Sequence, residues 1–224
     1  MIRIKSSRIL IAAACAFAVS CASGPDMYIA KEVSAVDKGE FLFTQGVARY
    51  EELLVEQNDL RSLQRVRKFF ENALIADPLH PQAEAWIAKG DAFGARRFST
   101  YMARAKALKA KGKRTAAENY EMVRAVKLAG DVKSDSEHAK LRSDTSDVRK
   151  EVIGSRVSRL SSLEGKIVAE KRPASLSKLI PQATRVKHEL DNVDPDNADA
   201  RKSIAAIDGH VSALAKKDID EAKR

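Results

Sequence analysis

The sequence predicts an all-α protein built from antiparallel helix hairpins. Apolar residues recur at steps of three and four along most of the 224-residue chain, which is the spacing of one helix face. Aromatic residues make up only 5%, with 10 Gly and 6 Pro, too few β-formers and turn residues for a sandwich or barrel. Asp-Pro pairs and several glycines separate the apolar stripes, and 44% hydrophobic residues suffice for a folded core.

The first two predicted helices cover residues 41–56 and 60–76. The stripe of the first comprises Phe43, Val47, Tyr50 and Leu54, and that of the second comprises Leu63, Val66, Phe70 and Ala73. The second helix ends at Asp77-Pro78, because proline disfavours helix in the residue before it. Together the two segments predict a first hairpin.

Three shorter helices are predicted in the middle of the chain, at 82–93, 100–111 and 115–129. Gly94, Gly112 and Gly130 follow these segments and predict turns or helix C-caps. The polar stretch 131–146 predicts either a loop or the frayed start of a long helix.

Three further helices complete the prediction, at 148–170, 175–192 and 197–216. Pro173 separates the first two, Asp194-Pro195 separates the last two, and Pro181 is placed near a first turn. No proline lies between Gln82 and Arg172, which favours long uninterrupted helices.

The N-terminus has the features of an export signal. Basic residues precede an uncharged run over 9–20, which is too short to span a bilayer but is the length of a signal-peptide apolar region. The sequence Ala18-Val19-Ser20-Cys21 resembles the lipobox of bacterial lipoproteins. That resemblance implies removal of residues 1–20 and lipidation of Cys21. The alternatives are an ordinary signal peptide cut near Ala22 and a buried N-terminal helix.

Removal of residues 1–20 would leave Cys21 as the only cysteine. A lipidated Cys21 leaves no thiol for a disulfide, a nucleophile or a thiolate metal site. Residues 21–38 are then expected to form a lipidated N-terminus and tether, 39–217 a helical domain, and 218–224 a charged tail.

Two exit turns carry a family resemblance. Ala73 to Pro78, with Val66 and Phe70 upstream, resembles the second helix and exit turn of a tetratricopeptide (TPR) repeat, and the segment Ala183 to Ala198 resembles the same element. The resemblance implies antiparallel hairpins in a TPR-like right-handed solenoid. The two Asp-Pro pairs are not separated by a whole number of 34-residue units, so an irregular helix bundle stays open as the alternative.

Catalytic and metal-binding motifs are not found in the sequence. The four histidines lack the spacing of a zinc-binding helix, and no GxSxG, P-loop or GxGxxG occurs. Each histidine is expected to be a surface or capping residue. We expect no enzyme activity, no cofactor and no metal.

The densest aromatic group of the mature chain comprises Trp86, Phe93, Phe98 and Tyr101. At helical spacing these residues predict core packing, and the alternative is that Trp86, Phe93 and Tyr101 line a groove that binds a partner peptide.

Positive charge is concentrated in one predicted hairpin. The full chain has a net charge of +9, and residues 89–127 hold eleven basic and three acidic residues. Lys106, Lys109 and Lys113 are predicted to form a basic ridge. Such a ridge is either a solvated helix face or a docking patch for an acidic partner or anionic envelope material. Export argues against nucleic acid.

Two function classes follow from these expectations. The first is a lipid-anchored, non-enzymatic TPR-like adaptor that binds envelope proteins. The second is a binding module for an anionic envelope ligand or polymer, acting through the hairpin 89–127. Ala22 after Cys21 resembles the pattern for outer-membrane delivery, so the expected location is the outer membrane, facing the periplasm.

Overall fold

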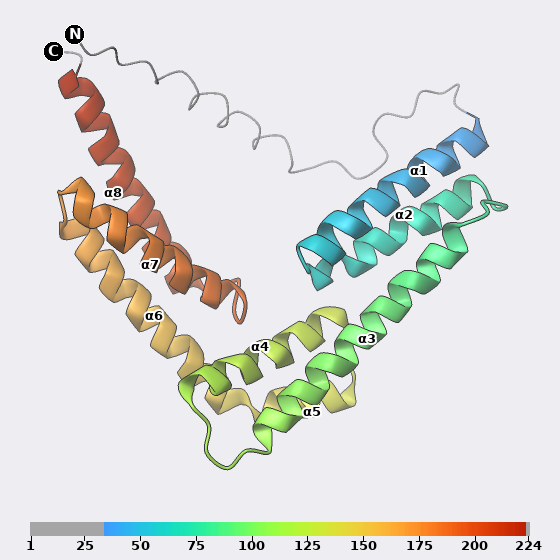
Figure 1. The fold of residues 1–224 in the computed structure, drawn as a ribbon, viewed down its shortest axis with the longest axis horizontal. Coiled ribbons are helices and arrows are strands. Elements are labelled where there is room, and N and C mark those ends of the chain that lie inside the picture. Colours follow the sequence, from blue (N-terminus) through green and yellow to red (C-terminus); the bar gives the residue numbers. More distant parts are fainter. Residues whose placement is uncertain (1–33, 223–224) are drawn as a thin grey trace, which may run out of the picture.

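The computed structural model describes residues 34–222, and within them the chain forms eight α-helices packed in antiparallel pairs (Figure 1). The helices are α1 (Ala35–Arg49), α2 (Leu63–Ala76), α3 (Ala83–Lys109), α4 (Ala116–Val132), α5 (Ser136–Asp144), α6 (Ser146–Ala169), α7 (Pro173–Asp191) and α8 (Ala198–Ala222). A π-helix, Tyr50–Glu56, continues α1, and a 3-10 turn, Leu60–Ser62, precedes α2. The all-α class is confirmed, whereas Cys21 and the predicted signal peptide lie outside the described residues.

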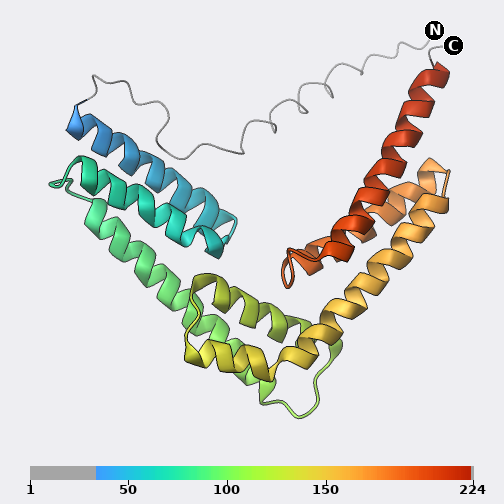
Figure 2. The ribbon, with the colours of Figure 1, turned by 180° about the vertical axis from the view of Figure 1, so that it is seen from behind.

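The helices form two arms that diverge from a common base (Figures 1 and 2). The first arm contains α1, α2 and the first half of α3, and the second contains α6, α7 and α8. The base contains the second half of α3, together with α4, α5 and the start of α6. Since α3 and α6 each belong to the base and to one arm, they connect the three parts. Antiparallel pairing is thus confirmed, and the right-handed solenoid stays a prediction.

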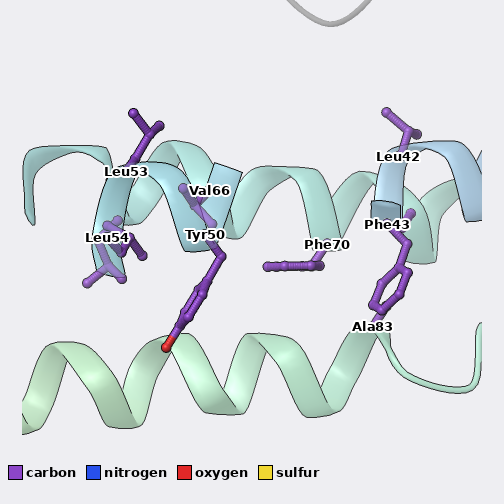
Figure 3. Close-up of a cluster of buried hydrophobic side chains, with 10 residues drawn as sticks. Leu42, Phe43, Tyr50, Leu53, Leu54, Val66, Phe70 and Ala83 are labelled. Atoms are coloured by element: carbon purple, nitrogen blue, oxygen red, sulfur yellow. The ribbon is translucent and has the colours of Figure 1, made fainter. Parts of the chain in front are cut away.

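The first arm has its own apolar core, drawn in Figure 3. Phe43, Tyr50, Val66 and Phe70 are all buried in it, on the side of α1 and α2 that faces α3. Gly46 allows α1 and α2 to approach closely, because a Cβ there would lie 2.7 Å from Cε1 of Phe70. Burial of these side chains is the main stabilising term for the arm.

The second arm repeats one feature of the first, its exit turn. The N–H of Asp77 donates to the carbonyl of Ala73 at 2.8 Å, and the N–H of Asp194 donates to that of Leu190 at 2.6 Å. Each aspartate carbonyl then accepts from the residue three positions on, His80 or Asn197, at 3.0 and 3.2 Å. The two Asp-Pro turns therefore share these hydrogen bonds, although Asp77 caps α2 directly, whereas α7 already ends at Asp191 and a short turn precedes Asp194.

The predicted break at Gly94 is wrong. Segments 82–93 and 100–111 belong to one helix, α3, and Gly94 is buried within it. A Cβ at Gly94 would lie 2.7 Å from Cδ2 of Leu63, so this glycine permits close packing and does not form a turn. Gly130 likewise lies inside α4, whereas Gly112 lies in the α3–α4 loop as predicted.

The segment 131–146 is mostly helical, since it contains α5. The side chain of Asp135 caps α5 by accepting from the N–H of His138 at 2.9 Å. Thr145 separates α5 from α6, with its hydroxyl donating to the carbonyl of Leu141 at 2.9 Å. The result is a bend between two helices, so the segment is neither a loop nor a frayed end.

Several helix ends differ from the predicted ones. α1 begins at Ala35, inside the segment expected to be tether, because the Ser34 hydroxyl caps it by accepting from the N–H of Asp37 at 3.1 Å. α7 begins at Pro173, so Pro181 lies in the interior of that helix and not near its first turn. α8 continues to Ala222, into the expected charged tail.

Candidate functional site

Trp86 lies in the aromatic core of the first arm. Its ring centroid is 5.3 Å from that of Tyr50, 5.6 Å from Phe70 and 6.2 Å from Phe43. The ammonium of Lys89 lies 3.7 Å above the indole and covers its outer face. These contacts favour the core interpretation of Trp86 over an exposed groove anchor.

The other two aromatic candidates lie further along α3. Phe93 is half-buried between the ring of Tyr50, at 5.9 Å, and the guanidinium of Arg97, at 5.1 Å. Tyr101 accepts a hydrogen bond from Nδ2 of Asn58 at 3.3 Å. Trp86 and Phe93 thus share a contact with Tyr50, whereas Tyr101 packs at the edge of the base core.

The predicted lysine ridge is not formed. The ammonium groups of Lys106 and Lys109 lie 2.5 Å from carboxylate oxygens of Glu137 and Asp144 on α5. α3 ends at Lys109, so Lys113 is exposed in the following loop and does not extend the same helix face. Two of the three candidate lysines are therefore ion-paired, because α5 brings two carboxylates against α3.

A further ion pair and a helix cap lie at the start of α4. Lys111 lies 2.5 Å from Glu118, and Thr115 and Glu118 form a reciprocal capping box. The ammonium of Lys111 and the N–H of Thr115 lower the pKa of Glu118 from its ordinary value of 4.5 to about 2. The positive charge of this hairpin is thus partly neutralised by its own contacts.

The strongest candidate site is a cavity of about 320 Å³ where the base meets both arms. Its lining comes from the turn before α2, from α4, α5 and α6, and from the turn between α7 and α8: Arg61, Val123, Val126, Lys127, Gly130, Asp131, Ser134, His138, Arg142, Thr145, Arg149, Val193, Asp194, Pro195 and Asp196. A ligand here would contact residues far apart in the sequence.

His138 forms part of the cavity wall and is only 2% exposed. Its Nε2 lies 3.0 Å from the carbonyl oxygen of Val126, which can only accept, so Nε2 donates, and its Nδ1 lies 3.2 Å from the hydroxyl oxygen of Ser134. Gly130 makes room for the ring, because a Cβ there would lie 2.8 Å from Cε1. The expectation of a surface or capping residue is therefore wrong for His138. His80 is also buried, at 6% exposed, and packs against Phe43, while its Nδ1 accepts from the N–H of Gln82 just before α3.

The cavity contains both paired and unpaired charges. Lys127 lies 2.5 Å from Asp131, and the guanidinium of Arg149 lies 3.5 Å from Asp194. The Asp194 carboxylate also accepts from Nδ2 of Asn197 at 3.0 Å. Among the described residues, no carboxylate lies within ion-pair distance of Arg142.

A second cavity of about 530 Å³ adjoins the first. It is lined by Ser134, Ala139, Arg142, Ser143, Ser146, Arg149, Lys150, Ile153 and Asp194. Four residues, Ser134, Arg142, Arg149 and Asp194, line both cavities. Three cations against one carboxylate make the second cavity electropositive, with a partly apolar wall from Ala139 and Ile153. The sequence pattern predicted none of these residues as a site.

Within residues 34–222, no helix is long and apolar enough to cross a membrane, and no three His, Cys, Asp or Glu side chains are grouped as metal ligands. Comparisons with models of protein families, with curated proteins and with solved structures found no match to this chain.

Proposed function

We propose that the protein is a lipid-anchored, non-enzymatic adaptor of the bacterial cell envelope, with degenerate TPR-like hairpins that hold a partner protein. Lipidation of Cys21 would anchor it to the outer membrane, with the helical domain facing the periplasm. The partner would bind between the arms, at the cavity in the base.

The observation that carries the proposal is the composition of this cavity. Its walls combine Arg61 of the first arm, residues of α4, α5 and α6, and the turn Val193 to Asp196 of the second arm. A partner seated there would contact the base and both arms at once. The equivalent hydrogen bonds at the two Asp-Pro turns support the TPR-like interpretation of the hairpins.

The alternative function, binding of an anionic envelope ligand through residues 89–127, has weaker support. Lys106, Lys109 and Lys111 each face a carboxylate at 2.5 Å, so a ligand would have to displace existing ion pairs. Exposed cations without a carboxylate partner remain in this segment at Arg96, Arg104 and Lys113. Arg96 and Arg104 are separated by more than two turns of α3, and Lys113 lies beyond the end of that helix, which makes a continuous patch less favourable.

Cross-linking in the native cell tests the proposal. A cleavable amine-reactive reagent should capture one protein at a stoichiometric ratio with the wild-type chain. Recovery of a lipid or glycan alone would contradict the adaptor and favour the alternative.

A further inference from the structure

The two cavities of the base share an arginine that lacks an anionic partner. Arg142 lies on α5 just before the bend at Thr145, and it lines both cavities. Within residues 34–222, Arg142 takes part in no ion pair with a carboxylate. The Arg142 side chain is exposed at the edge of both cavities, and a guanidinium with unused donors is suited to a carboxylate or phosphate oxygen.

A second arginine lies one bend away on α6. The guanidinium of Arg149 is 3.5 Å from Oδ1 of Asp194, which is longer than a charge-assisted hydrogen bond, and the other carboxylate oxygen, Oδ2, accepts from Nδ2 of Asn197 at 3.0 Å. Arg149 therefore keeps donors for a ligand. Lys150 adds a third cation at the rim, since the carboxylate of Asp147, with which it pairs, is 3.5 Å away and highly exposed.

The surroundings favour a singly charged carboxylate over a phosphate. Asp194 lines both cavities and would repel the two charges concentrated on one phosphate group more strongly than the single charge of each carboxylate in a peptide. Ala139 and Ile153 give the second cavity an apolar wall, which suits the methylene groups of Glu or Asp side chains. The two volumes, about 320 and 530 Å³, are within the range of small-ligand sites and can hold a few residues of a peptide.

We propose that these cavities bind an acidic peptide segment, with its carboxylates held by Arg142 and Arg149. That this segment belongs to the partner protein is an inference that rests on the proposed adaptor function. Binding of an acidic peptide as such does not depend on it.

Fluorescence anisotropy with labelled tetraglutamate tests the site on the full chain, at low and at moderate salt. The wild type should bind tetraglutamate and not tetraglutamine. Arg142→Gln should weaken binding about tenfold, the effect of losing one charge-assisted hydrogen bond. Arg104→Gln on α3 removes the same charge outside both cavities and should change affinity less than twofold, with circular dichroism showing an intact fold in both variants.

Equal losses in the Arg142 and Arg104 variants would overturn the proposal, because they would indicate general attraction to a basic protein. If inorganic phosphate binds at Arg142 and tetraglutamate does not bind, the proposal is overturned in favour of a phosphate site. If a cross-linked partner is retained undiminished by Arg142→Gln, the adaptor function stands and the acidic-segment inference fails. If tetraglutamate binds at Arg142 but no protein is cross-linked in cells, the inference of acidic-peptide binding stands and the adaptor function fails.

Discussion

Replacement of Trp86 by alanine distinguishes a core residue from a groove anchor. The change removes three ring contacts at 5.3 to 6.2 Å, each worth about 1 kcal/mol, and the indole surface that they cover. Since Trp86 is half-buried, we expect a loss of about 3 kcal/mol in the free energy of unfolding, at the lower end for a large aromatic residue. For a chain of this size the midpoint of thermal unfolding should fall by about 6–12 °C.

Far-UV circular dichroism is the suitable assay, because Trp86 is the only tryptophan in the sequence and its removal abolishes indole fluorescence. Phe41→Ala in the same arm is the matched control: its side chain is 53% exposed, and the change should cost less than about 0.5 kcal/mol. A loss below 1 kcal/mol for Trp86→Ala, together with lost capture of the partner, would refute the core interpretation.

Three further predictions concern packing, pH and lipidation. Gly46→Ala should lower the unfolding free energy by roughly 1 kcal/mol, because overpacking against a buried ring outweighs helix propensity. Gly90→Ala, whose new Cβ would have no neighbour within 4 Å, should raise the unfolding free energy by up to about 1 kcal/mol, and a change of the same sign in both variants would contradict the packing described. The pKa of Glu118 is lowered to about 2 in the folded state, so its stabilising effect is complete above its ordinary pKa of 4.5 and is lost as pH falls toward 2. Glu118→Gln should therefore reduce the loss of unfolding free energy between pH 4.5 and 2, and an unchanged loss would count against the ion pair. Metabolic labelling with a fatty acid should mark the wild type and not Cys21→Ala, and equal labelling of both would exclude lipidation at that residue.

The helices themselves could be predicted because their signals are local. Stripes of apolar residues at steps of three and four follow from the geometry of one helix. Asp77-Pro78 follows the last residue of α2, and Asp194-Pro195 lies in the turn between α7 and α8, as expected from the fixed backbone of proline. Pro173 at the start of α7 is another local signal. These features need no knowledge of tertiary contacts.

Gly94 shows where local reasoning fails. A glycine suits a turn, and it equally suits a helix position that a neighbouring helix approaches closely. At Gly94 the second case holds because Leu63, thirty-one residues earlier, packs against it. Nothing in the surrounding sequence distinguishes the two, so the break in α3 was predicted wrongly.

The candidate site was missed for a related reason. α5 has little apolar pattern of its own, and it is held by the Asp135 cap and by Lys106 and Lys109 of α3. Arg142 and Arg149 flank the bend at Thr145 and line a cavity only because the turn before α8 packs beside them. The only sequence signal for this site was a pair of arginines seven residues apart in a polar stretch, and such pairs are common on solvated helices.

The central claim, that a partner binds at the base between the arms, is tested most directly by site-specific photo-cross-linking in the native cell. In one variant a photoreactive phenylalanine analogue replaces Ala139, which lines the second cavity. In the control variant the same analogue replaces Ala103, an exposed residue of α3 outside the cavities. We expect Ala139 to cross-link to one protein and Ala103 to give no product. Equal products from both positions, or a product from Ala103 alone, would contradict the claim.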